Sequence, residues 1–387
     1  MVVNTDICIV GGGIMGLAAA YSIANSSDSK VLILDRYGIG NDYSSSNDVN
    51  RVFRYAYGND ELYTRMAVES LKLWRKLERE SGQELLLPTG LLMLQGEDES
   101  ANGFNEASYQ TLSSMKLGAE QLGAEELRKR FPQFSAEKGF FDPHGGALLA
   151  SKALSVLSSS MEKHAVKICK GQARRLIFGD HSSVEMAEGE NVRFRKLIVT
   201  VGPWSNSLLN PKLTSMTPTR QQLIYFRPRQ NLDLFRPRTC PVFFTDKHYG
   251  LPAAGIEGVK VSPKELNDPV DPDKANRSVD RDQIAVCRDV CRRFVPGLAD
   301  GEVVHSKVCL YDMTENSDFV LDVDPVHPEV VYGYGFSGHG FKFAPLIGEL
   351  LSELVLDRKL NFPLERFSAD PSRRGPPAIG AHLGKGK

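Results

Sequence analysis

The sequence has few of the features that mark secreted, metal-binding, membrane or nucleic-acid-binding proteins. Its 387 residues include six widely scattered cysteines and no CxxC pair, which argues against a disulfide framework and a metal site. The formal net charge is −1, whereas a nucleic-acid partner would require a concentrated basic face. No apolar run reaches the length of a bilayer span, and no charged-then-apolar leader opens the chain. We therefore predict an intracellular protein, cytoplasmic or peroxisomal, that binds no metal, nucleic acid or membrane.

The first 35 residues have instead the pattern of a dinucleotide-binding unit. In order they form a short apolar run, a glycine turn, an Ala-rich helical segment, a second apolar run and an acid: residues 7–10, Gly11-x-Gly13-x-x-Gly16, residues 17–24, residues 31–34 and Asp35. The glycines permit a tight turn, a close backbone approach to a pyrophosphate and close packing of helix against strand. The helix N-terminus offers N–H groups to phosphates, and Asp35 is placed to accept a ribose hydroxyl. A fortuitous glycine-rich turn is the alternative, but the flanking strands and the acid favour dinucleotide binding.

A second glycine-rich turn, residues 335–340, feeds a long apolar helix far from the first turn in sequence. A discontinuous Rossmann-like domain is therefore predicted, built from residues 1–85, 140–212 and 313–368, with a substrate-binding domain from residues 86–139 and 213–312. We expect the Pro-, Gly- and Lys-rich tail, residues 370–387, to be disordered. The tail contains Ala381-His382-Leu383, which resembles a peroxisomal signal, but such a signal is read only at the very C-terminus and four residues follow it here.

Local patterns predict the type of several further segments. Residues 62–77 have the apolar spacing of an amphipathic helix, and residues 105–131 are also predicted to be helical with a polar outer face. Residues 85–94 are predicted to form one strand, and so are residues 249–261.

A polar loop, residues 37–50, follows the dinucleotide motif, and its small hydroxyl and amide side chains suit a segment that wraps a cofactor. Arg51 and Arg54 come next. Their spacing of three residues would place both on one face of a helix, where a solvated basic surface is the alternative to a binding site.

Taken together, several short segments resemble the monomeric sarcosine oxidase family, which includes N-methyltryptophan, pipecolate and saccharopine oxidases and, more distantly, fructosyl-amino-acid oxidases. These segments are the Gly11–Gly16 turn with Asp35, NRVFRYAYG (50–58), TVGPW (200–204), YGLP and GVK (249–260), VCLY (308–311) and GFSGHGFKF (335–343). The resemblance implies an α/β, or α+β, two-domain fold: a Rossmann-like FAD domain of glutathione-reductase type and a mixed or antiparallel substrate sheet. It also implies that the chain oxidises the C–N bond of secondary amino acids to an imine and reduces O2 to H2O2.

The resemblance assigns roles to two residues that local patterns would leave ordinary. Cys309 in VCLY matches the cysteine that bonds covalently to the flavin, whereas a buried inert thiol is the alternative. Lys260 in GVK matches the lysine that promotes oxygen reduction, since a fixed cation stabilises the charge that develops on oxygen. An ordinary strand lysine is the alternative for Lys260.

The remaining catalytic assignments concern the substrate. Arg54 and Lys342 match the pair that binds the substrate carboxylate, in which Arg supplies a bidentate fork and Lys a point charge. Arg51 matches an arginine packed against the flavin. Tyr249 and Tyr311 match tyrosines that line the substrate cavity, although either alone would be explained as a satisfied core aromatic.

The motifs and the resemblance together predict a set of residues that bind FAD: Gly11, Gly13, Ile14, Met15, Gly16, Asp35, Arg36, Ser44, Ser45, Asn50, Arg51, Gly202, Trp204, Cys309, Gly338, Gly340, Phe341 and Lys342. The predicted partners are a small amino acid and O2, and the predicted state is a monomer.

Two departures from the sarcosine oxidases leave the substrate open. Asn47 and Lys264 stand where that family has histidines that touch the flavin or the substrate cavity. Tyr311 favours a sarcosine- or pipecolate-type substrate, whereas the SNDVN loop (46–50) is closer to saccharopine, pipecolate and fructosyl enzymes. Two alternative hypotheses for the function are a flavin dehydrogenase that passes electrons to a protein acceptor and a flavin-bound redox sensor. Lys260 counts against the first, and the Arg54–Lys342 pair against the second.

Overall fold

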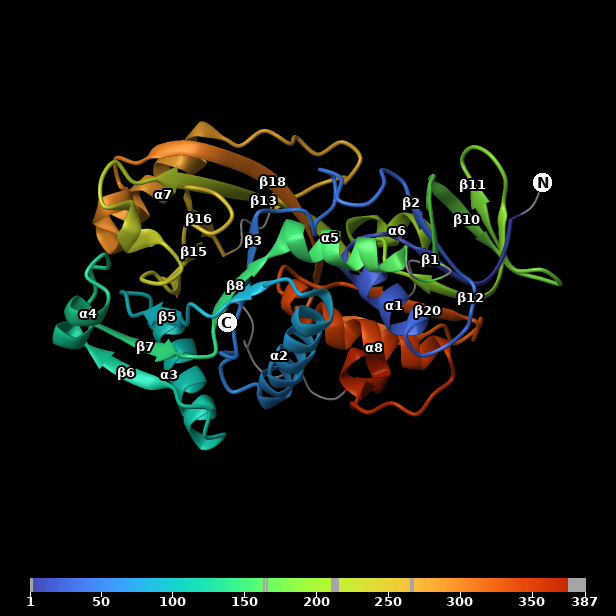
Figure 1. Cartoon of the computed structure of the whole chain (residues 1–387), viewed down its shortest axis with the longest axis horizontal. Helices are drawn as coiled ribbons and strands as arrows, with labels where there is room; N and C mark the ends of the chain where they lie inside the picture. The colour runs from blue at the N-terminus through green and yellow to red at the C-terminus, as the bar shows by residue number, and fades with distance from the viewer. Residues whose placement is uncertain (1–2, 163, 165, 210–215, 265–267, 375–387) are drawn as a thin grey trace.

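Two large β-sheets, each with its own helices, form the two lobes of the molecule (Figure 1). The computed structural model describes residues 3–162, 164, 166–209, 216–264 and 268–374. One sheet is mostly parallel and the other mostly antiparallel, which confirms the predicted two-domain α/β class. Strands of the first sheet come from three separate parts of the chain, but the exact domain boundaries stay a prediction.

The first sheet has eight strands in the order β10-β11-β12-β1-β2-β9, with β20 beside β12 and β19 beside β20. The central pairs β12–β1, β1–β2, β2–β9 and β12–β20 are all parallel. The strand bounds are β1 Val3–Val10, β2 Val31–Asp35, β9 Val166–Lys170, β10 Ala173–Ile177, β11 Ser183–Met186, β12 Val192–Val199, β19 Val320–Val323 and β20 Val330–Tyr334.

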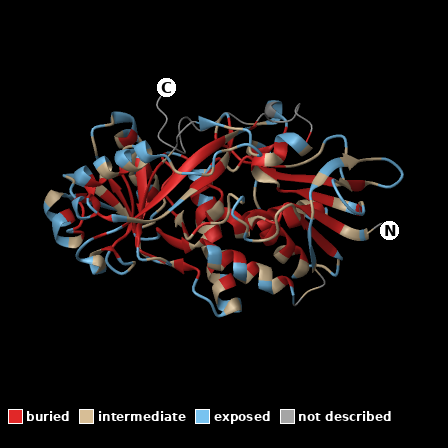
Figure 2. Cartoon of the chain, turned by 90° about the horizontal axis from the view of Figure 1, so that it is seen from above, coloured by how far each residue is buried: buried red, intermediate tan, exposed pale blue. Residues whose placement is uncertain are grey.

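Both faces of the second half of β1, residues 7–10, are buried, as expected for a central parallel strand. Ile7 and Ile9 belong to the core that contains the helices α1 (Ile14–Ala24), α5 (Ala150–Met161) and α8 (Ala344–Val355). Cys8 and Val10 belong to a separate core on the opposite face. Figure 2 shows the resulting buried interior of this lobe.

The second sheet has nine strands in the order β17-β13-β16-β15-β14-β5-β7-β6, and β18 also pairs with β13. Only the pair β14–β5 is parallel, so the sheet is mixed as predicted. The two longest strands, β13 and β18, run from this lobe to the 3-10 helix η1 of the first lobe. The bounds are β5 Leu91–Leu94, β6 Glu120–Gly123, β7 Lys138–Asp142, β13 Met216–Arg227, β14 Val242–Phe244, β15 His248–Leu251, β16 Val259–Pro263, β17 Asp268–Pro269, β18 Glu302–Thr314 and η1 Gly202–Trp204.

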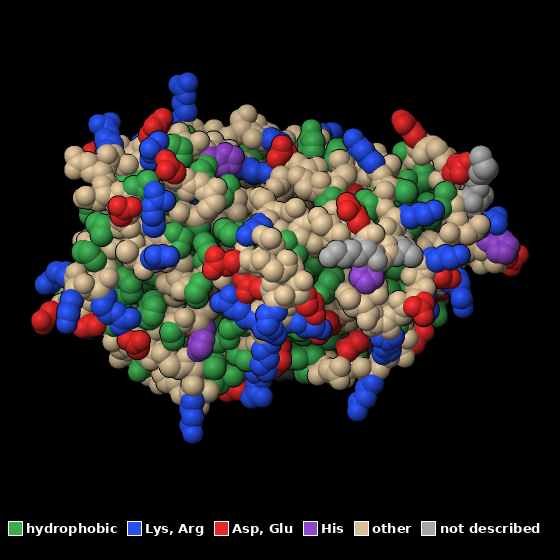
Figure 3. All heavy atoms as spheres, viewed as in Figure 1, with side chains coloured by type: hydrophobic (Ala, Val, Ile, Leu, Met, Phe, Trp, Pro, Cys, Tyr) green, Lys and Arg blue, Asp and Glu red, His purple; other side chains and the backbone are tan. Residues whose placement is uncertain are grey.

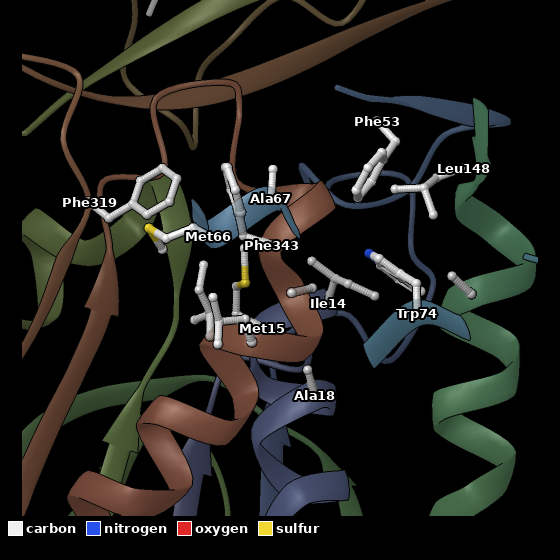
Figure 4. Close-up of a cluster of buried hydrophobic side chains, with 14 of the residues drawn as sticks. Ile14, Met15, Ala18, Phe53, Met66, Ala67, Trp74, Leu148, Phe319 and Phe343 are labelled. Carbon is white, nitrogen blue, oxygen red and sulfur yellow. The ribbon is translucent and has the colours of Figure 1, made fainter. Parts of the chain in front are cut away.

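A small sheet and helix α2 lie where the lobes meet. The small sheet has the order β3-β8-β4, and the indole N–H of Trp74 on α2 donates a 2.8 Å hydrogen bond to the Lys342 carbonyl. Figure 4 shows Trp74, Ile14, Met15 and Phe343 in this shared core, which fixes the second glycine turn against the first lobe. The remaining bounds are β3 Asn50–Phe53, β4 Leu86–Leu87, β8 Gly146–Leu149, α2 Glu61–Ser81, α3 Glu99–Ser114, α4 Ala124–Arg130, α6 Ser205–Leu208, α7 Arg281–Phe294, η2 Leu232–Phe235, η3 Pro296–Leu298, η4 Phe341–Phe343, η5 Glu365–Phe367 and η6 Pro371–Arg373.

The predicted helix over residues 105–131 is wrong in extent. Helix α3 ends at Ser114, strand β6 follows, and α4 forms a separate short helix. Lys116 and Gly118 both have positive φ, at 56° and 72°, and two left-handed residues so close together end an α-helix.

Two predicted single strands are pairs of strands. Residues 85–94 contain β4 and β5, which join different sheets because the chain turns at Pro88 and at Gly90, where φ is +73°. Residues 249–261 contain the antiparallel pair β15 and β16, separated by a turn that includes Gly255 at φ +78°. Sequence patterns gave the strand type but missed the turns.

The predicted helical face of Arg51 and Arg54 is also wrong, because residues 50–53 form strand β3 paired with β8. Pairing with β8 fixes this segment as extended, which the three-residue spacing of two charges could not reveal.

The surface carries charges of both signs. On the face seen in Figure 3, Lys and Arg side chains are interspersed with Asp and Glu. Among the helices of the described residues, none is long and apolar enough to cross a bilayer. Most of the tail predicted to be disordered, including Ala381-His382-Leu383, lies outside the described residues.

Candidate active site

The first cavity opens at the carboxyl ends of β1 and β2, where the glycine turn leads into α1. Gly11 has φ +105°, and a Cβ there would collide with the Thr200 carbonyl. A Cβ at Gly16 would collide with the Gly11 carbonyl oxygen, so α1 packs on β1 at backbone distance. The tight turn and the close helix–strand packing expected of this motif are therefore present, whereas the approach to a pyrophosphate stays a prediction.

The close packing of Gly16 against the Gly11 carbonyl leads to a testable prediction. Gly16→Ala is expected to displace the turn, so that the purified protein contains far less bound dinucleotide and melts at a lower temperature. Gly103→Ala in α3 is the matched control, because nothing lies within 4 Å of an added Cβ there. A Gly16→Ala protein with full cofactor content would contradict the packing argument.

The carboxylate of Asp35 lines this cavity at the end of β2. One of its oxygens accepts hydrogen bonds from the amides of Tyr37 (2.9 Å) and Gly38 (2.8 Å), and the other accepts one from Gly12 (2.9 Å). The carboxylate therefore holds the glycine turn and the following loop together, while its proposed bond to a ribose stays a prediction.

The second cavity lies against one face of the second sheet. The register pairs Tyr225 with Lys260, and on the other side of β13 it pairs Gln221 with Cys309 and Thr219 with Tyr311. Paired residues share a face and alternate residues along a strand do so too, so Lys260, Cys309 and Tyr311 all face the same way. Tyr249, opposite Ser262 on β16, joins them. The opposite wall comes from β3 and from the turn at 338–342.

Sequence reasoning missed a buried residue behind the wall of this cavity, Asp48. Its carboxylate accepts hydrogen bonds from Lys260 Nζ (2.6 Å) and the Tyr225 hydroxyl (2.6 Å), and it forms an ion pair with Arg51. Lys260 also donates to the Asn50 carbonyl at 2.6 Å and is fully buried. The available signal was an acid in the polar loop three residues before Arg51.

The charges of Asp48, Arg51 and Lys260 stabilise one another. Burial alone would raise the pKa of the Asp48 carboxyl, but the cations of Arg51 and Lys260 outweigh it and lower that pKa. Burial lowers the pKa of Lys260 to about 8 against the opposing attraction of Asp48. Lys260 is therefore a buried cation at neutral pH, held in place by two oxygens.

Cys309 lies between the two cavities. Its sulfur is 3.5 Å from Arg51 Nη2, which lines the second cavity, and donates to the carbonyl of Ser45 at 3.4 Å. Ser45 lines the first cavity, and its hydroxyl donates to the Leu310 carbonyl at 2.6 Å. The thiol therefore contacts one lining residue of each cavity.

Arg54 and Lys342 lie together in the second cavity, both almost fully buried. Lys342 Nζ donates to the Tyr57 hydroxyl (2.8 Å) and the His339 carbonyl (2.6 Å), while the Arg54 guanidinium lies 4.3 Å from the centre of the Tyr57 ring. Burial lowers the pKa of both residues, and repulsion from Arg54 lowers that of Lys342 further. Two buried cations so arranged favour an anion between them.

Two predicted cavity tyrosines, Tyr249 and Tyr311, and two residues that depart from the sarcosine oxidases, Lys264 and Asn47, remain to be placed. Tyr249 and Tyr311 both line the second cavity and hydrogen-bond to each other, and burial raises the pKa of Tyr311 to about 12. Lys264 also lines this cavity. Asn47 lines neither cavity, because its amide bonds to the Gly40 carbonyl (3.0 Å) and to Asp42 (3.2 Å).

Most of the predicted residues line one of the two cavities. The first cavity includes Gly11, Gly13, Asp35, Arg36, Ser44, Ser45, Gly202 and Trp204. The second includes Arg51, Arg54, Tyr249, Lys260, Tyr311, Gly338, Phe341 and Lys342. Neither lining includes Ile14, Met15, Gly16, Asn50, Cys309 or Gly340.

Known proteins are similar to this chain over almost its whole length. The family described as DAO, FAD dependent oxidoreductase, matches residues 6–354. The chain is 30% identical over 381 residues to the monomeric sarcosine oxidase of Bacillus sp. (strain B-0618), covering 95% of this chain and 96% of that protein. It is 31% identical over 377 residues to the peroxisomal sarcosine oxidase of Mus musculus, covering 94% and 95%. The structure of NikD, an unusual amino acid oxidase essential for nikkomycin biosynthesis, superposes with a TM-score of 0.82 at 24% identity, covering 95% of this chain and 97% of that chain.

Proposed function

Because the chain belongs to the family of FAD-dependent oxidoreductases, we propose that its two cavities serve the oxidation of a secondary amino acid. The enzyme is an FAD-dependent amino acid oxidase: it oxidises the C–N bond to an imine and reduces O2 to H2O2. The observation that carries this function is the second cavity, where a carboxylate clamp, Arg54 with Lys342, and the buried cation Lys260 occupy one chamber. The chamber is linked to the first cavity through Arg51, Cys309 and Ser45.

The residues of the first cavity fit the cofactor. Gly11 and Gly13 present bare backbone at the N-terminus of α1, where N–H groups and the helix dipole favour a pyrophosphate. Asp35 lies at the end of β2, where an acid binds a ribose in this fold. When bound, FAD supplies the redox chemistry, and the protein supplies position and charge.

The residues of the second cavity have separate roles in the proposed reaction. Arg54 and Lys342 hold the substrate carboxylate, which fixes the position of the reacting C–H bond. Tyr249 and Tyr311 exclude water from the chamber with their rings. Asp48 keeps Lys260 in place and charged, so that a fixed cation is present where charge develops on O2. The imine product hydrolyses in water without a dedicated protein base.

A substrate panel tests this function. Sarcosine, N-methyl amino acids, proline, pipecolate, saccharopine and fructosyl-amino acids are added to the yellow holoenzyme without oxygen and then in air. At least one is expected to bleach the flavin absorbance and to yield H2O2 stoichiometrically in air. Bleaching without H2O2 would indicate a dehydrogenase with a protein acceptor, and absence of any bleaching would contradict the enzyme function.

The covalent attachment of FAD through Cys309 is the next part of the proposal. Support comes from the VCLY segment and from the position of the thiol beside Arg51 and Ser45.

Acid precipitation checks this attachment. The wild-type pellet is expected to stay yellow, whereas the Cys309→Ala pellet is expected to be colourless, with free FAD in its supernatant. Cys291→Ala is the control, because Cys291 is equally buried but lies in α7 and lines neither cavity. Complete release of flavin from wild-type protein would show that the bond is not formed.

We also propose that the enzyme acts as a monomer on secondary amino acids. Residues of one chain line both cavities, so no second copy is required to complete them.

A further inference from the structure

The walls of the second cavity carry more positive charge than a single substrate carboxylate would balance. Five of its lining residues are Lys or Arg, namely Arg51, Arg54, Lys260, Lys264 and Lys342, and none of the described residues that line it is Asp or Glu. Asp48, behind the wall, pairs with Lys260 and Arg51. One substrate carboxylate would be held by Arg54 and Lys342. That leaves Lys264 to be explained.

Lys264 has room for an anionic partner. Its ammonium donates to one neutral acceptor, the Asp246 carbonyl at 2.7 Å, and lies 5.6 Å from the centre of the Phe244 ring. No carboxylate of the described residues lies within ion-pair distance of this ammonium. Asp246 and Asp98 attract this ammonium without forming an ion pair with it. Burial and, to a smaller extent, repulsion from the Arg54 cation lower the pKa of Lys264 to about 8.

The position of Lys264 indicates where a second anionic group of the ligand would bind. Lys260, Ser262 and Lys264 alternate along β16 and its end, so the two lysines face the same cavity at a separation of about 13 Å along the strand. Arg54 is near enough to Lys264 to repel it. The cavity therefore extends from the oxygen-activating lysine past the clamp to a second cationic end.

We propose that Lys264 binds a second carboxylate of the substrate, so that the preferred substrates are dicarboxylic secondary amino acids. These are N-alkylated acidic amino acids, or amino acids whose N-substituent carries a carboxylate. This inference rests on the proposed oxidase function, and it selects one class within it. The bond formed is charge-assisted, between a partly buried ammonium and a carboxylate.

Matched substrate pairs test the inference: N-methyl-L-glutamate against N-methyl-L-glutamine, and iminodiacetate against sarcosine. The wild-type enzyme is expected to favour the acidic member of at least one pair by about tenfold or more in kcat/KM, the effect of one charge-assisted hydrogen bond. Lys264→Met is expected to abolish this preference, and Lys264→Arg to keep most of it. Lys247→Met is the control, because Lys247 is an exposed residue between β14 and β15 whose carbonyl accepts from the Lys264 amide, and it lines neither cavity.

A binding measurement gives an independent readout. Succinate and its monoamide, succinamate, are titrated into the oxidised holoenzyme, and the change in flavin absorbance gives each Kd. The ratio of the two Kd values is expected to favour succinate in the wild type and to fall about tenfold in Lys264→Met.

The outcomes distinguish failure of the second-carboxylate site from failure of the proposed oxidase function. Oxidation of neutral and acidic substrates with equal kcat/KM, unchanged in Lys264→Met, would overturn the second-carboxylate site while the oxidase function stands. A Lys264→Met enzyme slowed only in its reaction with O2 would also overturn it, and would place Lys264 at the oxygen site. Absence of oxidation of any amino acid would instead contradict the proposed function itself.

Discussion

Lys260→Met is expected to slow the reaction of the reduced enzyme with O2 by about 10²–10³-fold and to leave anaerobic reduction by substrate near its normal rate. Negative charge develops on oxygen only in the oxidative half of the cycle, and only an interaction stronger in the transition state accelerates a step. Lys260 is a fixed cation with two oxygen partners at 2.6 Å, so it needs no reorganisation during that step. Stopped-flow absorbance measures the two half-reactions separately.

The same lysine predicts a pH dependence. Because burial lowers the pKa of Lys260 to about 8, Lys260 is protonated below that pH and loses its charge as the pH rises through it. The rate constant for reaction with O2 is therefore expected to fall above about pH 8 in the wild type. That fall should be absent from Lys260→Met, whose rate is already low.

The variant should fold, because Asp48 keeps other partners when Lys260 is removed. Arg51, the Tyr225 hydroxyl and the Val49 amide all still bind its carboxylate. Lys307→Met is the matched control, since Lys307 lies on the same sheet but pairs with Asp42 and lines neither cavity. Equal slowing of both half-reactions in Lys260→Met would assign Lys260 a structural role. No slowing of either would place the oxygen site elsewhere, with Arg51 or Lys264 as the next candidates.

The parts of the fold that were predictable from sequence rest on local signals. Strand, glycine turn, helix and strand follow one another within 35 residues, and the collisions at Gly11 and Gly16 are consequences of that local geometry. Type and approximate bounds of α2 also followed from apolar spacing. Left-handed breaks such as Lys116 did not, because a lysine gives no sign of a positive φ.

The centre of the site depends on contacts between residues far apart in sequence. Asp48 and Lys260 are 212 positions apart, and their pairing requires the loop before β3 to lie on the face of β16. Only sheet register decides that Lys260, Cys309 and Tyr311 share this face. The family resemblance supplied the lysine and the cysteine, whereas Asp48, whose role depends on partners in other elements, had no motif to reveal it.

Removal of either clamp cation is expected to weaken carboxylate binding by about 10- to 100-fold, the range for a lost charge-assisted hydrogen bond. In Arg54→Ala and Lys342→Ala the effect should appear in KM for the substrate and, to a similar extent, in Kd for inert carboxylates such as acetate. Without an anion, burial and, to a smaller extent, repulsion from Arg54 lower the pKa of Lys342. A bound carboxylate relieves that repulsion, so binding of the anion and protonation of Lys342 reinforce each other.

That linkage predicts that carboxylate affinity falls as the pH rises, because Lys342 loses its proton, and that Lys342→Ala flattens this dependence. Arg75→Ala is the matched control: Arg75 is a partly buried arginine on α2 that bonds to Glu78 and the Leu86 carbonyl, and it lines neither cavity. The effects of Arg54→Ala and Lys342→Ala should not add in the double variant, because the two residues hold one ligand group. Unchanged KM and Kd in both single variants would remove the clamp, and a carboxylate anchored elsewhere, at Lys264 or Arg51, would take its place.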